Sequence, residues 1–174
     1  MCAVSARAIA RYRTAPHWHP PLTAMTLSAT HFLPHPQCAY RADMTAPAIL
    51  ILTTGGTIDK NYFDALSEYQ IVESGIPDLL KVARVTIPHR VEEVCRKDSL
   101  DLTDADRAEI AARAAKAAET RIVITHGTDT MTETAKLLAA AVPDKVIVLT
   151  GALAPARFAD TDAPFNLGMA LATA

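Results

Sequence analysis

Three apolar runs, each ending in glycine and threonine, constrain the fold of this chain more than any other feature. The runs cover residues 48–53, 121–125 and 145–150, and they end in "TTGGT", "THGTDT" and "TGA". Continuous apolar runs of this length are typical of strands buried on both faces of a parallel sheet. Helical patterns alternate with them along the chain. The alternation predicts an α/β fold with helices on both faces of the sheet.

The remaining segments complete the expected order of elements. We expect a long loop or a hairpin over 57–72, a short helix over 75–83, short strands over 83–87 and 91–95, and helices over 103–118, 130–142 and 163–174. Pro88 separates the two short strands. A capping-box pattern from Thr130 to Glu133 predicts the start of the helix over 130–142.

Residues 1–43 differ from the rest of the chain in composition. They hold four arginines against one acid, five of the eleven prolines and four of the six histidines, without a lasting periodicity. This composition predicts a disordered leader. A transit peptide, a metal-binding histidine tract and a start site misassigned ahead of Met44 are alternative interpretations. We favour the last, because the ordered pattern begins at residue 48, and we predict a folded domain over 44–174.

The composition argues against several classes of protein. No apolar run approaches the roughly 18 residues that a membrane-spanning helix needs. A net charge of −2, with four Phe and four Tyr, argues against a nucleic-acid-binding surface. The three cysteines, Cys2, Cys38 and Cys95, have no metal-ligand spacing and form no even disulfide framework. We therefore expect a reduced, cytoplasmic protein.

The polar ends of the three apolar runs carry groups suited to hydrolysis. The carboxyl ends of parallel strands meet at one rim of a sheet, where ligands bind. Gly55 and Gly56 can expose backbone N–H groups beside the hydroxyl of Thr57, while Thr128 and Asp129 precede a helix whose start favours negative charge. Two threonines and an aspartate on one rim indicate amide or ester hydrolysis. Helix capping by Asp129 is an equally good interpretation.

These segments resemble the L-asparaginase/glutaminase family of amidohydrolases. "TGGTID" is similar to the family's first motif, "THGTDTMTETA" to its second, and "LTGALAPARFADTDAPFNLGMA" to the segment that follows. The resemblance covers residues 48–174, which correspond to the family's N-terminal domain, and the length resembles that of its short single-domain members. It implies a three-layer, flavodoxin-like parallel sheet and a homo-oligomer. It also implies hydrolysis of a small carboxamide such as L-asparagine, without a metal or a cofactor.

The resemblance assigns a role to each matching residue. Thr57 would be the nucleophile that forms the acyl-enzyme, Thr128 the second catalytic threonine, and Tyr69 (or, as the weaker candidate, Tyr62) the tyrosine that orients the nucleophile. Ser99 would bind the substrate α-carboxylate, and Asp129 would bind the α-amino group. Gly56 and Gly127 would be the backbone donors to the oxyanion.

Each of these segments also has a purely structural interpretation. The tyrosines can pack a hairpin, and Ser99 can cap the helix that follows it. We expect His126 to be a structural histidine, Cys95 a core thiol and Arg157 a surface residue, although Arg157 is also a candidate carboxylate binder.

Two features depart from the family pattern. Leu100 follows Ser99, where many members carry a polar residue such as glutamine. No residue matches the lysine that activates the second threonine, which in the family lies beyond the helix expected over 163–174. Such assistance contributes on the order of 10²- to 10⁴-fold, so we expect low activity or none from this chain. We also expect a working protein that continues past Ala174.

Two other functions compete with amide hydrolysis. A non-catalytic module that binds an amino acid or a small carboxylate on the same rim is the main alternative. Nucleotide binding at Gly55-Gly56 is disfavoured, because G-x-G-x-x-G spacing and a following helix are both missing.

Overall fold

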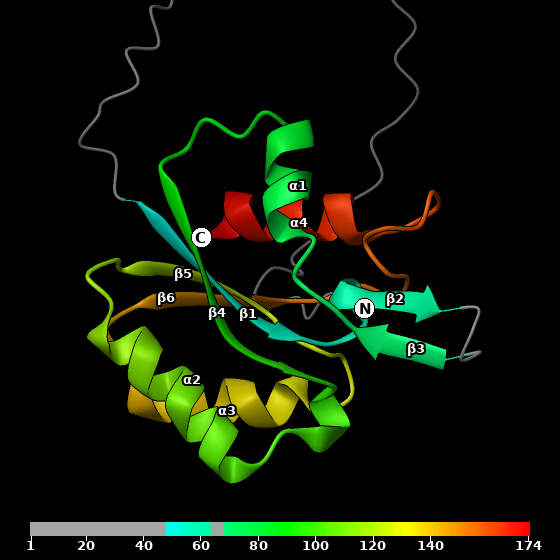
Figure 1. Ribbon diagram of the computed structural model, residues 1–174. Helices are drawn as coiled ribbons and strands as arrows, with labels where there is room; N and C mark the ends of the chain where they lie inside the picture. The colour runs from blue at the N-terminus through cyan, green and yellow to red at the C-terminus, as the bar shows by residue number, and fades with distance from the viewer. Residues whose placement is uncertain (1–47, 64–67) are drawn as a thin grey trace, which may run out of the picture. The chain divides into compact units, whose positions relative to one another are not determined.

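The computed structural model of the protein describes residues 48–63 and 68–174 (Figure 1). The predictions for residues 1–43 (disorder, a transit peptide, a histidine tract, a start at Met44) lie outside these ranges. Within the described ranges, no helix combines the length and the apolar character that crossing a membrane would require.

A four-stranded sheet in the order β4-β1-β5-β6 forms the middle layer. Its strands are β1 (Ile49–Gly55), β4 (His89–Lys97), β5 (Arg121–Thr125) and β6 (Val146–Thr150). Every neighbouring pair is parallel. The two interior strands, β1 and β5, are buried along almost their whole length. The three apolar runs are therefore adjacent parallel strands, as their sequences predict.

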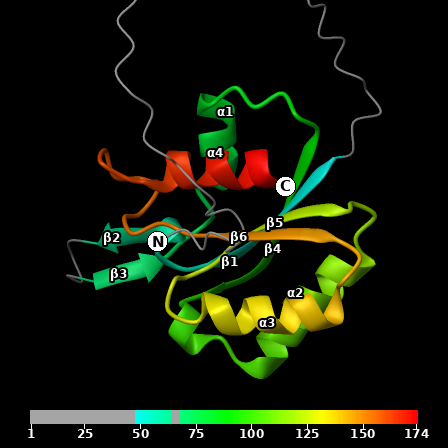
Figure 2. The same ribbon diagram turned by 180° about the vertical axis from the view of Figure 1, so that it is seen from behind.

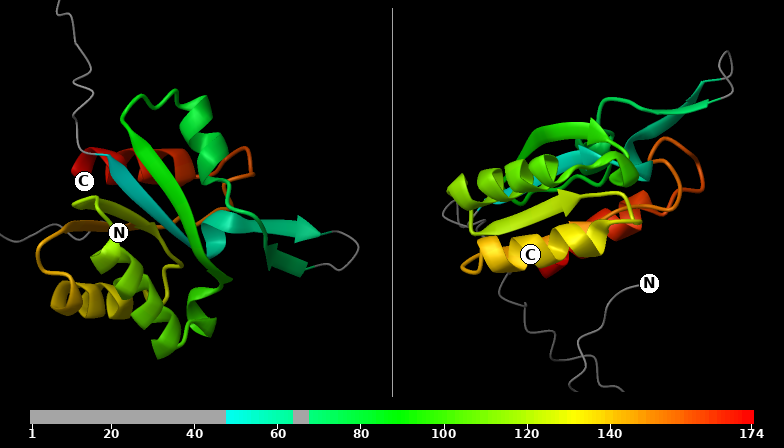
Figure 3. Two further views of the ribbon diagram at one scale, coloured as in Figure 1. Left: turned by 60° about the vertical axis from the view of Figure 1, so that its left-hand side comes forward. Right: turned by 90° about the horizontal axis from the view of Figure 1, so that it is seen from below.

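Two pairs of helices cover the two faces of this sheet, as Figures 1 and 2 and the left view of Figure 3 show. The helices are α1 (Ile76–Val82), α2 (Asp104–Lys116), α3 (Met131–Ala141) and α4 (Ala163–Thr173). Ile51 of β1 shares a buried cluster with Leu167 of α4, and its neighbour Leu52 shares another with Leu138 of α3. Successive residues of β1 thus enter opposite cores. The predicted three-layer α/β architecture is confirmed.

The segment between β1 and β4 differs in part from the expectation. β2 (Lys60–Phe63) and β3 (Glu68–Ile71) pair antiparallel as the two arms of a hairpin, one of the two alternatives predicted. The predicted strand over 83–87 is wrong: Ala83 caps α1, and Arg84 adopts a positive φ of 52°. The register explains the difference. His89 pairs with Ile49, the first residue of β1, so residues before His89 have no strand beside them.

The predicted capping box at α3 is also wrong. Thr130 occupies the N-cap position but makes no side-chain capping bond. Its Oγ1 donates instead to the carbonyl of Ser99 at 2.7 Å, and Glu133 pairs with Arg107 at 3.1 Å. The Thr130 hydroxyl thus bonds to Ser99, 31 residues away, instead of to the backbone of Glu133 in its own helix.

Candidate active site

The polar ends of β1, β5 and β6 lie side by side at one edge of the sheet. Thr53, Thr125 and Thr150 are register partners across these three strands. The glycine-containing segments that follow them therefore leave the sheet at the same rim, and the predicted convergence is confirmed.

Glycine is required at the end of β1 because the backbone there is both left-handed and closely packed. Gly55 has a φ of 97° and Gly56 a φ of 79°, and side chains other than hydrogen rarely tolerate such angles. A Cβ on Gly55 would lie 2.7 Å from the carbonyl oxygen of Lys97, and one on Gly56 would lie 2.6 Å from the nitrogen of Gly127. The loop after β1 therefore packs directly against the ends of β4 and β5.

Thr57 and Thr128 each follow one of these touching glycines. Thr57 is half-buried and opens the 3-10 turn η1 (Thr57–Asp59), whereas Thr128 is exposed. Since the backbones of Gly56 and Gly127 are in contact, the two predicted catalytic threonines directly follow a pair of neighbouring residues. The N–H of Gly56 already donates to the carbonyl of Lys97 at 3.0 Å. Gly56 thus shapes the loop, and its own N–H is engaged.

Ser99 reaches the same place from the end of β4. It is fully buried in the 3-10 turn η2 (Ser99–Asp101), and a Cβ on Gly127 would lie 2.5 Å from its Oγ. The Oγ donates a long hydrogen bond, 3.5 Å, to Oδ2 of Asp129, whose side chain is exposed. Three segments distant in sequence therefore meet at Gly127.

The capping roles considered for Ser99 and Asp129 are wrong. Thr103 caps α2, where it forms a complete capping box with Asp106, and Thr130 holds the N-cap position of α3. Neither Ser99 nor Asp129 therefore caps α2 or α3.

Two lysines near the glycine loop are held in ion pairs. Lys97 contacts Asp106 at 2.7 Å, and Lys60 contacts Asp98 at 2.5 Å. The hydrogen bond to Asp106 raises the pKa of Lys97. Both lysine ammonium groups near the glycine loop therefore have a carboxylate partner.

Tyr69 lies on the hairpin and keeps over half of its surface, 54%, exposed. Its ring is 5.2 Å from that of Tyr62 and 6.3 Å from that of Phe158, measured between centroids. The packing interpretation of the tyrosines is thus observed. The orienting role of Tyr69 stays a prediction.

His126 is buried between two hydrogen-bond partners. Its Nδ1 contacts the carbonyl of Gly127 at 2.7 Å and its Nε2 the hydroxyl of Thr134 at 2.8 Å. A carbonyl only accepts, so Nδ1 carries the proton and Nε2 accepts from Thr134. Burial lowers the pKa of His126. The expected structural role is confirmed, and it fixes the peptide at Gly127.

Residues 48–174 match the family described as "Asparaginase, N-terminal". The chain belongs to this family. It is 35% identical over 144 residues to L-asparaginase 2 of Escherichia coli, which covers 76% of this chain and 40% of that protein. It is 32% identical over 140 residues to the glutaminase-asparaginase of Pseudomonas fluorescens, with 72% and 38% covered.

Solved structures give the same picture. The thermostable L-asparaginase from Thermococcus kodakarensis matches with a TM-score of 0.62 at 30% identity, over 71% of this chain and 39% of that one. The probable cytoplasmic L-asparaginase from Campylobacter jejuni matches with a TM-score of 0.60 at 34% identity, over 72% and 39%. The chain thus spans about two fifths of the length of the curated asparaginases it matches.

Sequence reasoning missed one buried acid beside Thr57. Asp59 closes the turn that Thr57 opens, and its side chain is only 2% exposed. It accepts hydrogen bonds from Ser74 Oγ at 2.9 Å and from the N–H of Gly75 at 3.1 Å. Burial raises the pKa of the Asp59 carboxyl. The sequence did contain a signal for it, because Asp59 is an acidic residue that directly follows Ile58, the apolar residue that ends "TGGTI".

The remaining candidates have structural contacts. Arg157 is exposed and donates to the carbonyl of Glu73 at 2.8 Å. Cys95 is half-buried, its thiol lies 3.4 Å from the carbonyl of Thr54, and burial raises the pKa of that thiol. Within residues 48–63 and 68–174, no group of three or more His, Cys, Asp or Glu side chains could hold a metal ion.

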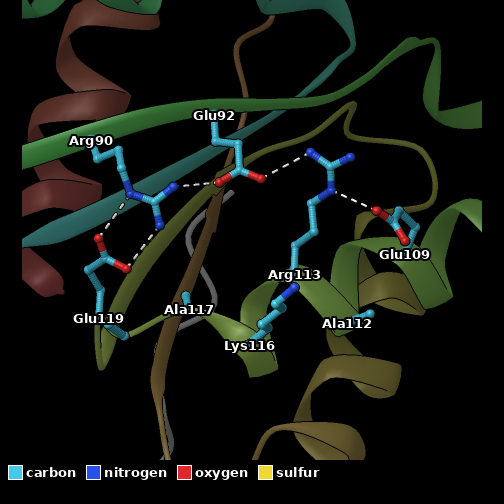
Figure 4. Close-up of a pocket in the computed structure, with 9 residues that line it drawn as sticks. Arg90, Glu92, Glu109, Ala112, Arg113, Lys116, Ala117 and Glu119 are labelled. Atoms are coloured by element: carbon cyan, nitrogen blue, oxygen red, sulfur yellow. Dashed lines mark hydrogen bonds and ion pairs between the residues drawn. The ribbon is translucent and has the colours of Figure 1, made fainter.

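A surface hollow of about 620 Å³ lies at the opposite end of the sheet, beside the start of β4 and the end of α2 (Figure 4). Arg90 pairs there with Glu92 and Glu119. Arg113 pairs with Glu92 and Glu109. These charges satisfy one another, so the hollow gives no reason to place the family's chemistry there.

Proposed function

We propose that this domain is an amidohydrolase of the asparaginase type that cleaves a small carboxamide such as L-asparagine through a threonine acyl-enzyme. One observation carries the proposal: Gly56 packs on Gly127, and Gly127 packs on Ser99, with no room for a side chain at either glycine. This packing gathers Thr57, Thr128 and Ser99 from the ends of three strands.

The chemistry follows from the groups at this rim. The Thr57 hydroxyl attacks the side-chain amide carbon, and the amide nitrogen leaves as ammonia with the proton that the hydroxyl loses. Water then hydrolyses the ester and restores the hydroxyl. Thr128 assists as the second threonine, and Tyr69 orients the nucleophile. The N–H of Gly127 contributes to the oxyanion site, while Gly56 gives the loop its shape.

Recognition of the amino-acid end falls to Ser99 and Asp129. The exposed Asp129 carboxylate attracts a substrate ammonium group, and the buried Ser99 hydroxyl beside it would give up its long hydrogen bond to Asp129 and donate to the substrate carboxylate instead. Leu100, 72% exposed, offers no polar group. We therefore expect weak binding of asparagine. Slow turnover is also expected, since the nearby lysines are ion-paired.

The test compares Thr57→Ala with Thr57→Ser, and uses Thr86→Ala, an exposed loop threonine, as the matched control. Ammonia release from asparagine should vanish in Thr57→Ala, persist in part in Thr57→Ser and stay unchanged in the control. A trapped acyl adduct on Thr57, seen by mass spectrometry, should follow the same order. Asparagine binding without ammonia release by the wild-type protein would favour the non-catalytic binding module instead.

Copies of the chain are further proposed to associate through β6. The other edge strand, β4, is rich in charged residues, which discourage edge pairing. β6 reads "VIVLT" and borders a groove of about 370 Å³ against α3. Val146 of β6 is 50% exposed, and on α4 Phe165 is 72% and Met169 50% exposed. An uncharged, apolar edge of this kind favours a second copy. A cytoplasmic location fits the free Cys95.

A further inference from the structure

Asp59 stands at the base of the hairpin that carries Tyr69. Its backbone N–H donates to the carbonyl of Gly56 at 3.1 Å, and its carbonyl accepts from the N–H of Val72 at 2.9 Å. β2 begins at the next residue, and β3 ends one residue before Val72. A single residue therefore bonds to the glycine loop and to both ends of the hairpin.

The Asp59 side chain extends this connection past the hairpin. Oδ1 accepts from Ser74 Oγ at 2.9 Å and from the N–H of Gly75 at 3.1 Å. These residues lie between β3 and α1. A carboxylate is costly to bury in a protein interior. Its two charge-assisted hydrogen bonds offset this cost. Both come from the short segment after β3, so they hold the end of the hairpin against the turn of Thr57.

The loop between β6 and α4 holds the same region from the other side. The N–H of Ala156 donates to the carbonyl of Ile58 at 3.0 Å, and Arg157 donates to the carbonyl of Glu73 at 2.8 Å. Phe158 packs on Tyr69. In Figure 1 the hairpin projects from the carboxyl edge of the sheet, so its orientation depends on these contacts at its base.

We propose that Asp59 is a positioning residue, which locks the base of hairpin β2–β3 to the turn of Thr57 and so sets where Tyr69 lies relative to the nucleophile. The inference rests on the proposed function for the role of Tyr69. The lock itself rests on the contacts of Asp59 alone. Without the side-chain bonds, only the backbone bond to Val72 and the contacts of the loop between β6 and α4 hold the base, and the hairpin then opens more often than the sheet does.

Hydrogen exchange measured by mass spectrometry tests the lock without turnover. Asp59→Ala should raise exchange in residues 60–63 and 68–72 by roughly ten- to a hundredfold, the loss expected for hydrogen bonds to a charged group, and leave β5 and α2 unchanged. Asp59→Asn keeps an acceptor oxygen for Ser74 and Gly75 and should remain near the wild type. Asp144→Ala, at an exposed position before β6, is the control.

Ser74→Ala gives a second route if Asp59→Ala fails to fold. It removes one donor to Asp59 and should raise hairpin exchange in the same direction by a smaller factor. In an Asp59→Ala protein that folds, an increase in exchange spread evenly over the whole chain, unchanged exchange in the hairpin, or an equal increase in Asp59→Asn would each overturn the proposal. If Asp59→Ala does not fold, unchanged hairpin exchange in Ser74→Ala would overturn it.

A kinetic arm separates this inference from the proposed function. If the wild-type protein hydrolyses asparagine, Asp59→Ala should lower kcat more than it raises KM, and Asp59→Asn should restore most of the loss. A wild type without turnover but with the expected exchange pattern would end the proposed function and keep the lock. Turnover in the wild type, with hairpin exchange unchanged in Asp59→Ala, would support the proposed function and exclude the lock.

Discussion

The same substitution at two glycines should have opposite effects on stability. Gly56 adopts φ 79° and ψ −171°, a region that is essentially reserved for glycine, and a non-glycine residue held in such a region costs about 1–3 kcal/mol. A Cβ there would also lie 2.6 Å from the backbone nitrogen of Gly127, and overpacking of this kind costs about 1–3 kcal/mol. Gly56→Ala should therefore lower the free energy of unfolding by about 2–6 kcal/mol.

Gly168 is the matched control. It is exposed within α4, and a Cβ there would meet nothing within 4 Å. Gly168→Ala should raise the free energy of unfolding by about 1 kcal/mol, because alanine is the better helix former. The restriction that alanine imposes on the unfolded chain is the same in both variants, so their difference reports the folded state.

Urea and thermal unfolding followed by far-ultraviolet circular dichroism measure both changes. At roughly 4 °C per kcal/mol for a domain of this size, Gly56→Ala should lower Tm by about 8–24 °C, and Gly168→Ala should raise it by about 4 °C. A Gly56→Ala protein whose free energy of unfolding lies within about 1 kcal/mol of the Gly168→Ala protein would refute the reasoning, because the backbone angle and the contact with Gly127 would then cost nothing.

Two further predictions concern the surface. The hydrogen bond from Lys97 lowers the pKa of Asp106 to about 2, below the unfolded value of about 3.9, so the stability from this carboxylate is present above about pH 4 and lost as the pH falls toward 2. Asp106→Asn should therefore melt below the wild type at pH 7 and together with it near pH 2; a gap independent of pH would contradict this linkage. Val146→Lys should shift sedimentation toward the monomer, whereas Val82→Lys, at a position 82% exposed on α1, should not; equal association in both variants would exclude the β6 edge.

Several parts of this protein could be predicted from local patterns. The strands β1, β5 and β6 are continuous apolar runs because helices cover both faces of the sheet. Each position along these strands therefore favours an apolar residue. The helices α2 and α4 follow from helix-forming residues and their flanking signals. The rim followed in turn, because adjacent parallel strands must end at a common edge.

Other parts depend on partners far away in the chain. The strand expected over 83–87 has its own β-branched residues, but a strand forms only where another strand pairs with it, and β1 begins opposite His89. Thr130 carries a capping pattern, yet its hydroxyl donates to Ser99, 31 residues away. Such choices are made by the position of the neighbouring segment.

The site divides in the same way. The sequence by itself determined that Thr57, Thr128 and Asp129 stand at the ends of strands, because local patterns place the strand ends, whereas Ser99 followed only from the family resemblance. Only the tertiary structure decided that Gly56 contacts Gly127 and that Gly127 contacts Ser99. It also decided that Asp59 is buried against Ser74 and Gly75. Periodicity and propensity report the environment of one residue, whereas these contacts exist only once the sheet has brought together segments that lie far apart along the chain.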